Sequence, residues 1–313
     1  MDRRRWPYAQ LASAMLGAAM LGARVAPAQE LNPRAYVITP IGTNAITLGY
    51  SHVEGAPDLS GAAPITDAHG YVDVAALGLY RSLYLFGRSA NIALAIPYAV
   101  GNFSGTAADA PKHATRSGLL DSSLRLAVNL IGGPAMEPKE FAQWHQDVLL
   151  GVSLKIVAPT GQYDPTSVIN LGTNRWAFKP EIGYSQRWDH WVLDGYAAVW
   201  FFTENSEYYP GMQSKTESSV KAFEAHLSYD VRPRLWISLD ANFWSGGETS
   251  VNGVANRSTY QRDSRVGVTA SIPINARNSV KLSFNDGAYV LYGGGYRTIS
   301  AFWQYGWVGP LLH

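Results

Sequence analysis

Ionisable side chains recur at every second position in several segments of the 313-residue chain. Lys179 and Glu181 share one face of AFKPEIGYS, and Glu224 and His226 share one face of FEAHLSYD. Such groups can pair with one another, move protons, or select a charged solute that passes them. The same alternation places a wider polar set on one face of the chain's extended segments: Asp121, Arg125, Asn129, Lys155, Lys179, Glu181, Glu224, His226, Asp240, Asn242, Arg265, Lys281 and Asn285. We expect this set to be either a structural network of ion pairs or the lining of a wet interior.

One subset of these residues has the types that a hydrolase site uses. His226 and Ser228 share a strand face, and Asp240 and Asn242 lie on the next predicted strand. A hydrolase needs a nucleophile, a base and an orienting group within hydrogen-bond reach of one another. Polar pairs two residues apart occur on any wet strand face, and no nucleophile-elbow motif accompanies them. We therefore expect a protein that is not an enzyme.

Metal and cofactor sites have weak support. The stretch GQYDPTSVINLGTN (161–174) carries Asp164, Asn170 and Asn174, whose oxygens could hold Ca²⁺, but their spacing matches no calcium-loop pattern. We predict a turn-rich surface loop instead. The chain has no Cys, which excludes disulfides and thiolate metal sites. The run YGGGY (292–296) lacks the strand-before and helix-after context of a phosphate loop and reads as an external turn. No metal and no cofactor are expected.

Strands must position the polar set, because a period of two is the signature of β structure. In DSSLRLAVNLI (121–131), Leu126 and its aliphatic neighbours at even positions oppose Arg125 and Asn129. Each predicted strand is as long as the roughly 9–11 residues that a tilted strand needs to cross a membrane. We predict twelve strands, near residues 43–54, 70–85, 89–100, 118–131, 144–158, 174–187, 191–203, 218–231, 234–246, 258–273, 278–291 and 294–307.

The connections alternate between long and short. The tight turns are FGRS, WDH, RP and INAR, and GGPAMEPKEFAQW (132–144) is an exception that is long enough for a helical turn starting at Pro138. The long connections are rich in Gly, Ser, Thr, Asn, Asp and Pro and cover residues 55–69, 101–117, 159–173, 204–217 and 247–257. Short periplasmic turns, longer extracellular loops and an even strand count are typical of a transmembrane antiparallel β-barrel.

Composition separates this barrel from a secreted β-sandwich, which shares the alternation. The chain has 10 Trp, 18 Tyr and a net charge of only +1, which argues for membrane interfaces and against nucleic acid as a partner. We predict that the aliphatic face meets lipid and the polar face meets water inside the barrel. One aromatic belt is expected at the short-turn end, from Trp188, Trp191, Trp236, Trp303, Tyr305 and Trp307. A second belt is expected at the other end, from Trp176, Trp200 and Trp244.

The first residues resemble a secretory signal. Arg3, Arg4 and Arg5 precede the apolar run 11–22, and the small-residue stretch 26–28 supplies a cleavage site. The run is too short to span a bilayer comfortably, which disfavours a membrane anchor. We predict that residues 1–28 are a cleaved signal peptide and that residues 29–313 form a single outer-membrane barrel domain.

The size of the barrel predicts a narrow or partly plugged lumen, because twelve strands lie between filled eight-stranded barrels and open porins. In the strand 191–203, Tyr196, Trp200 and Phe202 face inward if Asp194 does, where they could contact an aromatic solute. The opposite parity places Trp200 in a lipid-facing belt, and the sequence leaves both arrangements open.

Three segments resemble one outer-membrane family. They are LKIVAPTGQYDPTSVINLGTNRWAFKPEIGYS (154–185), GLLDSSLRLAVNLIGGPA (118–135) and AVWFFTEN (198–205). The family is labelled meta-pathway of phenol degradation, and the resemblance spans essentially the mature chain. The sequence departs from the family pattern at residues 118–122, where relatives commonly show Gly-Leu-Gly-Asp-Pro. It departs again at the end, where VGPLLH follows Trp307.

The resemblance implies a channel or transporter for passive uptake of small hydrophobic or aromatic compounds. Its partners would be outer-membrane lipid, the solute and the barrel assembly machinery. The alternative from a different class is a structural or adhesive barrel with a plugged lumen.

Overall fold

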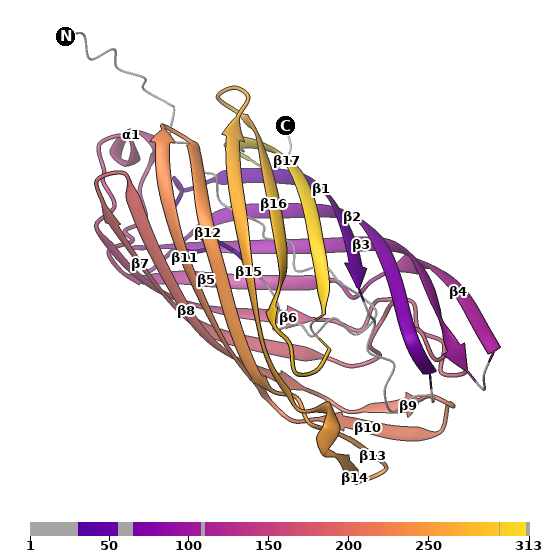
Figure 1. Cartoon of the computed structure of the whole chain (residues 1–313). Helices are drawn as coiled ribbons and strands as arrows, with labels where there is room; N and C mark the ends of the chain where they lie inside the picture. The colour runs from indigo at the N-terminus through magenta and orange to yellow at the C-terminus, as the bar shows by residue number, and fades with distance from the viewer. Residues whose placement is uncertain (1–30, 56–64, 108–109, 294, 311–313) are drawn as a thin grey trace.

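A single antiparallel sheet closes on itself to form the body of the protein (Figure 1). The computed structural model describes residues 31–55, 65–107, 110–293 and 295–310. The signal peptide predicted over residues 1–28 lies outside the described residues and stays a prediction. The wall strands are β1 (Thr43–Gly55), β2 (Ile65–Leu85), β3 (Arg88–Ala107), β5 (Ser123–Ile131), β6 (Val148–Val157), β7 (Ala177–Trp188), β8 (Trp191–Phe202), β11 (Val220–Arg232), β12 (Leu235–Gly246), β15 (Gln261–Pro273), β16 (Asn278–Tyr289) and β17 (Tyr296–Val308).

Neighbouring wall strands pair in chain order, and β1 pairs with β17 to close the ring. The twelve-stranded antiparallel barrel is thus confirmed. One predicted strand, 118–131, is interrupted: β4 (Ala110–Leu119) and β5 pair with successive parts of β3 and are separated by residues 120–122. Closure satisfies the backbone hydrogen bonds of every wall strand and leaves no edge in the membrane.

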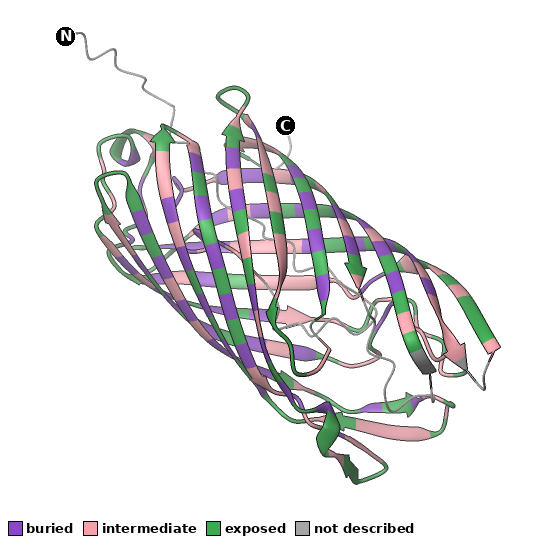
Figure 2. Ribbon diagram, in the orientation of Figure 1, coloured by how far each residue is buried: buried purple, intermediate pink, exposed green. Residues whose placement is uncertain are grey.

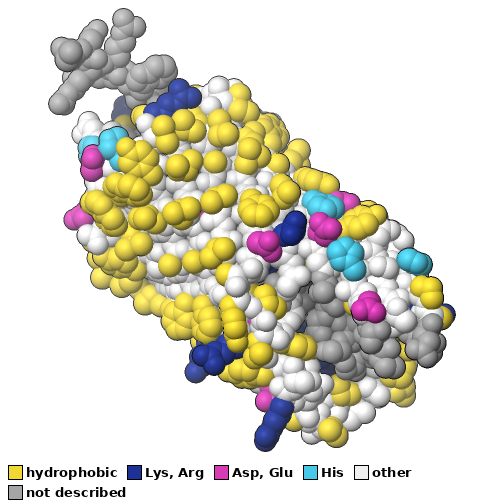
Figure 3. Space-filling view, in the orientation of Figure 1, with side chains coloured by type: hydrophobic (Ala, Val, Ile, Leu, Met, Phe, Trp, Pro, Cys, Tyr) yellow, Lys and Arg dark blue, Asp and Glu magenta, His cyan; other side chains and the backbone are white. Residues whose placement is uncertain are grey.

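The two faces of the wall differ as the alternation predicts. Leu126 is 43% exposed on the outside, whereas its neighbour Ala127 is 3% exposed on the inside. Figure 2 shows buried and exposed positions alternating along the strands, and Figure 3 shows the apolar side chains gathered on the outer surface of the barrel wall. An apolar outer band around a closed barrel is the surface that lipid covers.

Two predicted long loops contain additional strands, so their interpretation as irregular loops was wrong. The strands β9 (Asn205–Tyr208), β10 (Gln213–Glu217), β13 (Thr249–Val251) and β14 (Val254–Asn256) form a separate four-stranded sheet at the extracellular end. A short 3₁₀ helix, η1 (Arg257–Thr259), follows β14. These strands are short and polar, so the sequence shows no alternating apolar pattern that would predict them. The predicted loop 101–117 is also wrong, because it forms the hairpin in which β3 continues into β4.

The periplasmic end carries the tight turns and the ends of the described chain (Figure 1). The predicted helical turn is confirmed as α1 (Pro138–Phe141). Proline occupies its first turn, and Glu137 and Glu140 form a reciprocal capping box. No helix among the described residues is long and apolar enough to cross a membrane.

The two predicted aromatic belts are only partly correct. Trp188, Trp191 and Trp303 are 44%, 40% and 39% exposed on the outer face, as expected of a belt. Trp236 and Trp244 are 1% and 0% exposed, because they share the inner face of β12 with Asp240. A side chain's face follows from the period of two along its strand, and closeness to a turn does not override it.

Candidate functional site

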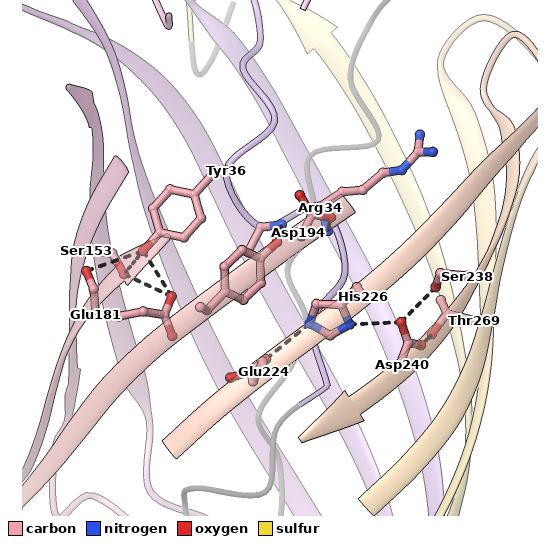
Figure 4. A network of polar contacts seen from close by, with 12 residues as sticks. Arg34, Tyr36, Ser153, Glu181, Asp194, Glu224, His226, Ser238, Asp240 and Thr269 are labelled. Carbon is pink, nitrogen blue, oxygen red and sulfur yellow. Dashed lines mark hydrogen bonds and ion pairs between the residues drawn. The ribbon is translucent and has the colours of Figure 1, made fainter. Parts of the chain in front are cut away.

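A band of charged side chains crosses the inner wall near mid-barrel (Figure 4). On β7, Lys179 Nζ lies 2.8 Å from Glu181 Oε2 and 3.1 Å from Glu224 Oε1, which comes from β11. Arg125 on β5 extends the band, with its guanidinium 3.7 Å from Glu181. Burial would penalise each of these charges heavily if it stood alone, so the pairs keep the band ionic.

The band continues through His226 to β12 and β15. His226 Nδ1 lies 2.9 Å from Asp240 Oδ1, and its Nε2 lies 3.5 Å from Glu224 Oε2. Asp240 also accepts hydrogen bonds from the hydroxyls of Ser238 and Thr269. Both ring nitrogens of His226 therefore face carboxylates. They do not face Ser228, whose hydroxyl has no hydrogen-bond partner within the described ranges, so the arrangement builds no activated nucleophile.

Residues 31–42, which precede β1, lie inside the barrel and contact this band. The backbone N–H of Arg34 donates to Asp194 Oδ2 (3.0 Å), and that of Ala35 donates to the Tyr196 hydroxyl (2.9 Å). Asn129 donates its side-chain amide to the carbonyl of Tyr36 (3.3 Å). We call residues 31–42 the inner segment. It fills the lumen at the level where the wall is most charged.

Tyr36 anchors the inner segment to the wall. Its hydroxyl donates to Glu181 Oε1 (3.0 Å) and lies 3.1 Å from Ser153 Oγ. Its ring lies over Gly151 and Gly183, which are register partners on β6 and β7. A Cβ atom at Gly183 would come within 2.7 Å of the ring carbon that carries the hydroxyl, and closer still to two others. The ring of Tyr36 thus fits against the wall only because residues 151 and 183 have no side chains. We call the space over these two glycines the slot.

The periplasmic end of the inner segment is held by charge and by apolar packing. Arg34 pairs with Asp230 at 2.7 Å, and its guanidinium lies 4.6 Å from the ring centre of Trp236. Asp230 also binds Arg187. Ile38, 1% exposed, belongs to an apolar cluster with Phe141 of α1, Leu149 of β6 and Met136, which precedes α1, and Trp144 packs against them. The inner segment is therefore docked on both sides of Tyr36.

Two apolar clusters lie on the inner wall toward the extracellular end, next to charged side chains such as Asp263 and Arg265. Trp200 is 0% exposed, stacks at 6.3 Å on Phe202, and packs in one cluster with Trp244 and Val220. Of the two arrangements open for β8, the structure has Tyr196 and Trp200 on the buried face with Asp194. Lys155 and Lys179 place their ammonium groups 6.0 and 5.8 Å from the Trp200 ring centre, where the charged band meets the aromatic lining.

A second apolar cluster faces it from β1, β2, β3 and β17. It includes Val53, Val72, Val74, Phe103 and Tyr296, which are all buried on the inner face. The loop between β6 and β7 covers this cluster with Ile169 and Leu171. We call these residues, with Ala76, Ala99 and Leu120, the apolar wall.

Asp121 anchors that loop and is not part of a wall strand. Its carboxylate accepts hydrogen bonds from the backbone N–H of Gly161 (2.8 Å) and of Thr173 (2.9 Å), and from the Thr173 hydroxyl (2.6 Å). Its contacts are those of a loop anchor, in the same stretch where the sequence departs from the family pattern.

The other predicted lining residues lie on the inner face at different heights. Asn242 is 4% exposed on β12, and Arg265 is 0% exposed, with its guanidinium 3.6 Å from the ring centre of Tyr296. Lys281 on β16 lies over Phe302 at 5.1 Å. Asn285 is the inner-face partner of Gly267 on β15. A lining role for these four residues stays a proposal.

The candidate calcium loop is satisfied by its own atoms. Asp164 accepts hydrogen bonds from the side chains of Ser167 (2.7 Å) and Thr166 (2.7 Å) and from the Thr166 backbone (2.9 Å). These hydrogen bonds, led by that of Ser167, lower the pKa of the Asp164 carboxyl. Asn170 closes the turn against Asp164, and Asn174 binds Asn205. No group of three metal-ligating side chains occurs among the residues that the structure describes.

The inner segment is the functional element that sequence reasoning missed. Its residues show no period and carry no motif. The available signal was the pair Gly151 and Gly183 on the inner face of adjacent predicted strands, since glycine inside a strand marks the close approach of another group. Nothing in the sequence identifies that group as Tyr36.

A closed barrel with an apolar outer band, tight turns at one end and long connections at the other defines an outer-membrane β-barrel protein. The family model described as "Putative MetA-pathway of phenol degradation" matches residues 66–299, and the chain belongs to this family. A search of curated proteins found no match.

Among solved structures, an outer membrane channel from Pseudomonas putida F1 is similar to this chain at 18% identity and a TM-score of 0.72, covering 88% of this chain and 99% of that one. The transport unit of the autotransporter AIDA-I from Escherichia coli is also similar, at 11% identity and a TM-score of 0.49, covering 86% and 90%. The first of these matches agrees with the closed barrel and its apolar outer band, and the protein resides in the outer membrane.

Proposed function

We propose that this protein is a passive channel by which small hydrophobic or aromatic compounds cross the outer membrane. The observation that carries the proposal is the pair of apolar clusters on the inner wall toward the extracellular end. Porin interiors are polar, because they conduct water and ions. Here, Val74 and Trp200 on opposite parts of the inner face are both 0% exposed within apolar clusters.

The strength of such a lining suits transport. Burying one small apolar side chain or ring is worth about 1.5–3 kcal/mol, which gives weak binding. Conduction requires binding that is favourable enough for a solute to enter and weak enough for it to leave. A solute with one aromatic ring would pass from the apolar wall to the charged band, where the inner segment must move aside.

Uptake into liposomes tests the proposal. Vesicles that contain the purified barrel should take up toluene and phenol faster than empty vesicles. Val74→Thr should lower toluene uptake about fivefold, because placing an unpaired hydroxyl in an apolar surface costs on the order of 1 kcal/mol. Val100→Thr is the matched control, since Val100 is 38% exposed on the outer face of β3, beside Asp73. Equal uptake by protein-containing and empty vesicles would refute the channel.

A structural or adhesive barrel is the second candidate. It is favoured by the inner segment, which fills the lumen, and by the extracellular sheet of β9, β10, β13 and β14. That sheet would be the adhesive surface. Equal uptake in the liposome experiment would favour this candidate.

The barrel assembly machinery is the transient partner that we propose for biogenesis. Trp307 supplies an aromatic side chain near the end of β17, the last wall strand.

A further inference from the structure

We propose that the slot holding Tyr36 is a binding site for phenolic solutes, and that Tyr36 occupies it as an internal ligand that a free phenol displaces. This inference rests on the proposed function and names the solute class and the event that opens the lumen. The side chain of Tyr36 is itself a phenol with a carbon at the para position. The wall therefore already binds the chemical group that a 4-alkylphenol would present.

The slot matches the shape of one ring. Gly151 and Gly183 lie opposite each other on β6 and β7, and a side chain at either position would overlap the ring of Tyr36. Tyr36 is 1% exposed, so the ring is enclosed on all sides. The ring of Tyr196 lies 5.3 Å away at 58°, a favourable geometry for two aromatic rings.

The slot also matches the hydroxyl. Glu181 Oε1 accepts the hydrogen bond from Tyr36 at 3.0 Å, and the other oxygen of this carboxylate is held by Lys179 at 2.8 Å. A hydrogen bond to a carboxylate is stronger than one between neutral groups. A methylbenzene in the same place could not donate this hydrogen bond, and the carboxylate oxygen would keep only the longer contact with Ser153 at 3.4 Å and that with Arg125. The site should therefore prefer phenols to toluene, although both fit the ring slot.

A cation completes the site. The guanidinium of Arg125 lies 4.9 Å from the ring centre of Tyr36, in the position of a cation–π contact, and 3.7 Å from Glu181. An apolar plug would need no carboxylate and no guanidinium around its ring. The backbone hydrogen bonds at Arg34 and Ala35 go to other wall residues, Asp194 and Tyr196, so they add to the docking that the ring provides.

Removing the ring tests recognition. Tyr36→Ala leaves the slot vacant, and 4-methylphenol should raise the unfolding temperature of the purified barrel in a saturable way. Toluene should need a concentration about fivefold higher or more for the same shift, because it lacks a hydrogen bond to the carboxylate that is worth about 1 kcal/mol or more. Tyr36→Phe keeps the ring but lacks the hydroxyl contacts to Glu181 and Ser153, so it should respond to less 4-methylphenol than the wild type and to more than Tyr36→Ala. An equal response of Tyr36→Ala to toluene and 4-methylphenol would overturn the inference.

Displacement is tested with Tyr36 in place, so that a folding defect of the alanine variant cannot leave the question open. The chain has no Cys, and Ala35→Cys therefore gives a single reporter beside Tyr36. Saturating 4-methylphenol should raise the rate at which a water-soluble maleimide labels this cysteine several-fold, and toluene at equal concentration should not. Met212→Cys, at a position 94% exposed in the extracellular sheet region, should label at one rate throughout. Unchanged labelling at residue 35 would refute displacement by phenol.

These outcomes are independent of the uptake experiment. Phenol-specific binding without uptake would refute the channel and leave the site. Uptake without phenol-specific binding or labelling would leave the channel and refute the site.

Discussion

Replacing Gly183 by alanine is expected to expel Tyr36 from its slot and to loosen the inner segment. The added Cβ would lie 2.7 Å or less from three ring atoms, whereas ordinary contact begins near 3.4 Å. The ring must retreat far enough to lengthen the hydrogen bonds that its hydroxyl makes at 3.0 Å to Glu181 and 3.1 Å to Ser153. Each such bond contributes about 1 kcal/mol net, so losing two lowers the docked population about 30-fold.

Single-channel recording and cysteine labelling would measure this effect. Gly183→Ala in planar bilayers should conduct more often than the wild type, and the reporter Ala35→Cys should be labelled faster in the Gly183→Ala background. Gly195→Ala is the matched control, because a Cβ at Gly195, on the neighbouring strand β8, meets no atom within 4 Å. Conductance and labelling that stay at the wild-type level in Gly183→Ala, or that change equally in Gly195→Ala, would show that Tyr36 does not hold the inner segment.

Three further substitutions test the wall, the charged band and the extracellular loop. Leu126→Arg should cost about 2–4 kcal/mol of unfolding free energy in lipid vesicles, because it places a charge against acyl chains, and an unchanged free energy would mean that the barrel faces are assigned the wrong way round. Lys179→Met should cost about 3 kcal/mol in denaturant unfolding, because it leaves buried carboxylates unpaired, and an unchanged midpoint would argue against an ionic band. The lowered pKa of Asp164 means that its hydrogen bonds stabilise the loop above the usual carboxyl pKa and that this stabilisation is lost as pH falls through the lowered value. The wild-type loop should therefore become more sensitive to an acid protease as pH falls, and at neutral pH Asp164→Asn should be cleaved faster than the wild type by a protease that is active there.

The barrel could be predicted because the alternation that specifies it is visible in neighbouring residues. A strand that separates lipid from a polar interior must alternate, and Leu126 beside Arg125 records that requirement within two residues. The charged band was predictable for the same reason, since Lys179, Glu181 and Glu224 share an inner face whatever their neighbours are. The partners of each charge were not predictable, because they depend on strand register across the sheet.

The inner segment could not be predicted, because its position depends on contacts far apart in the chain. Tyr36 meets Ser153 across 117 residues and Glu181 across 145 residues. No local period records such contacts. The extracellular sheet was missed for a different reason: strands such as β9 and β13 have only four and three residues, which is too short for a period of two to show.

The carboxylate of Asp121 has a consequence for how the extracellular side of the lumen opens. It binds both Gly161 and Thr173, so it joins the two ends of the stretch that carries Ile169 and Leu171. A cross-link between loop ends removes conformational entropy from the loop, as a disulfide does, but this one can dissociate. The loop therefore behaves as a preformed cap and not as a fluctuating chain. Its release is a cooperative event at one carboxylate, and every solute that reaches the apolar wall from outside must wait for that event or pass around a rigid cap.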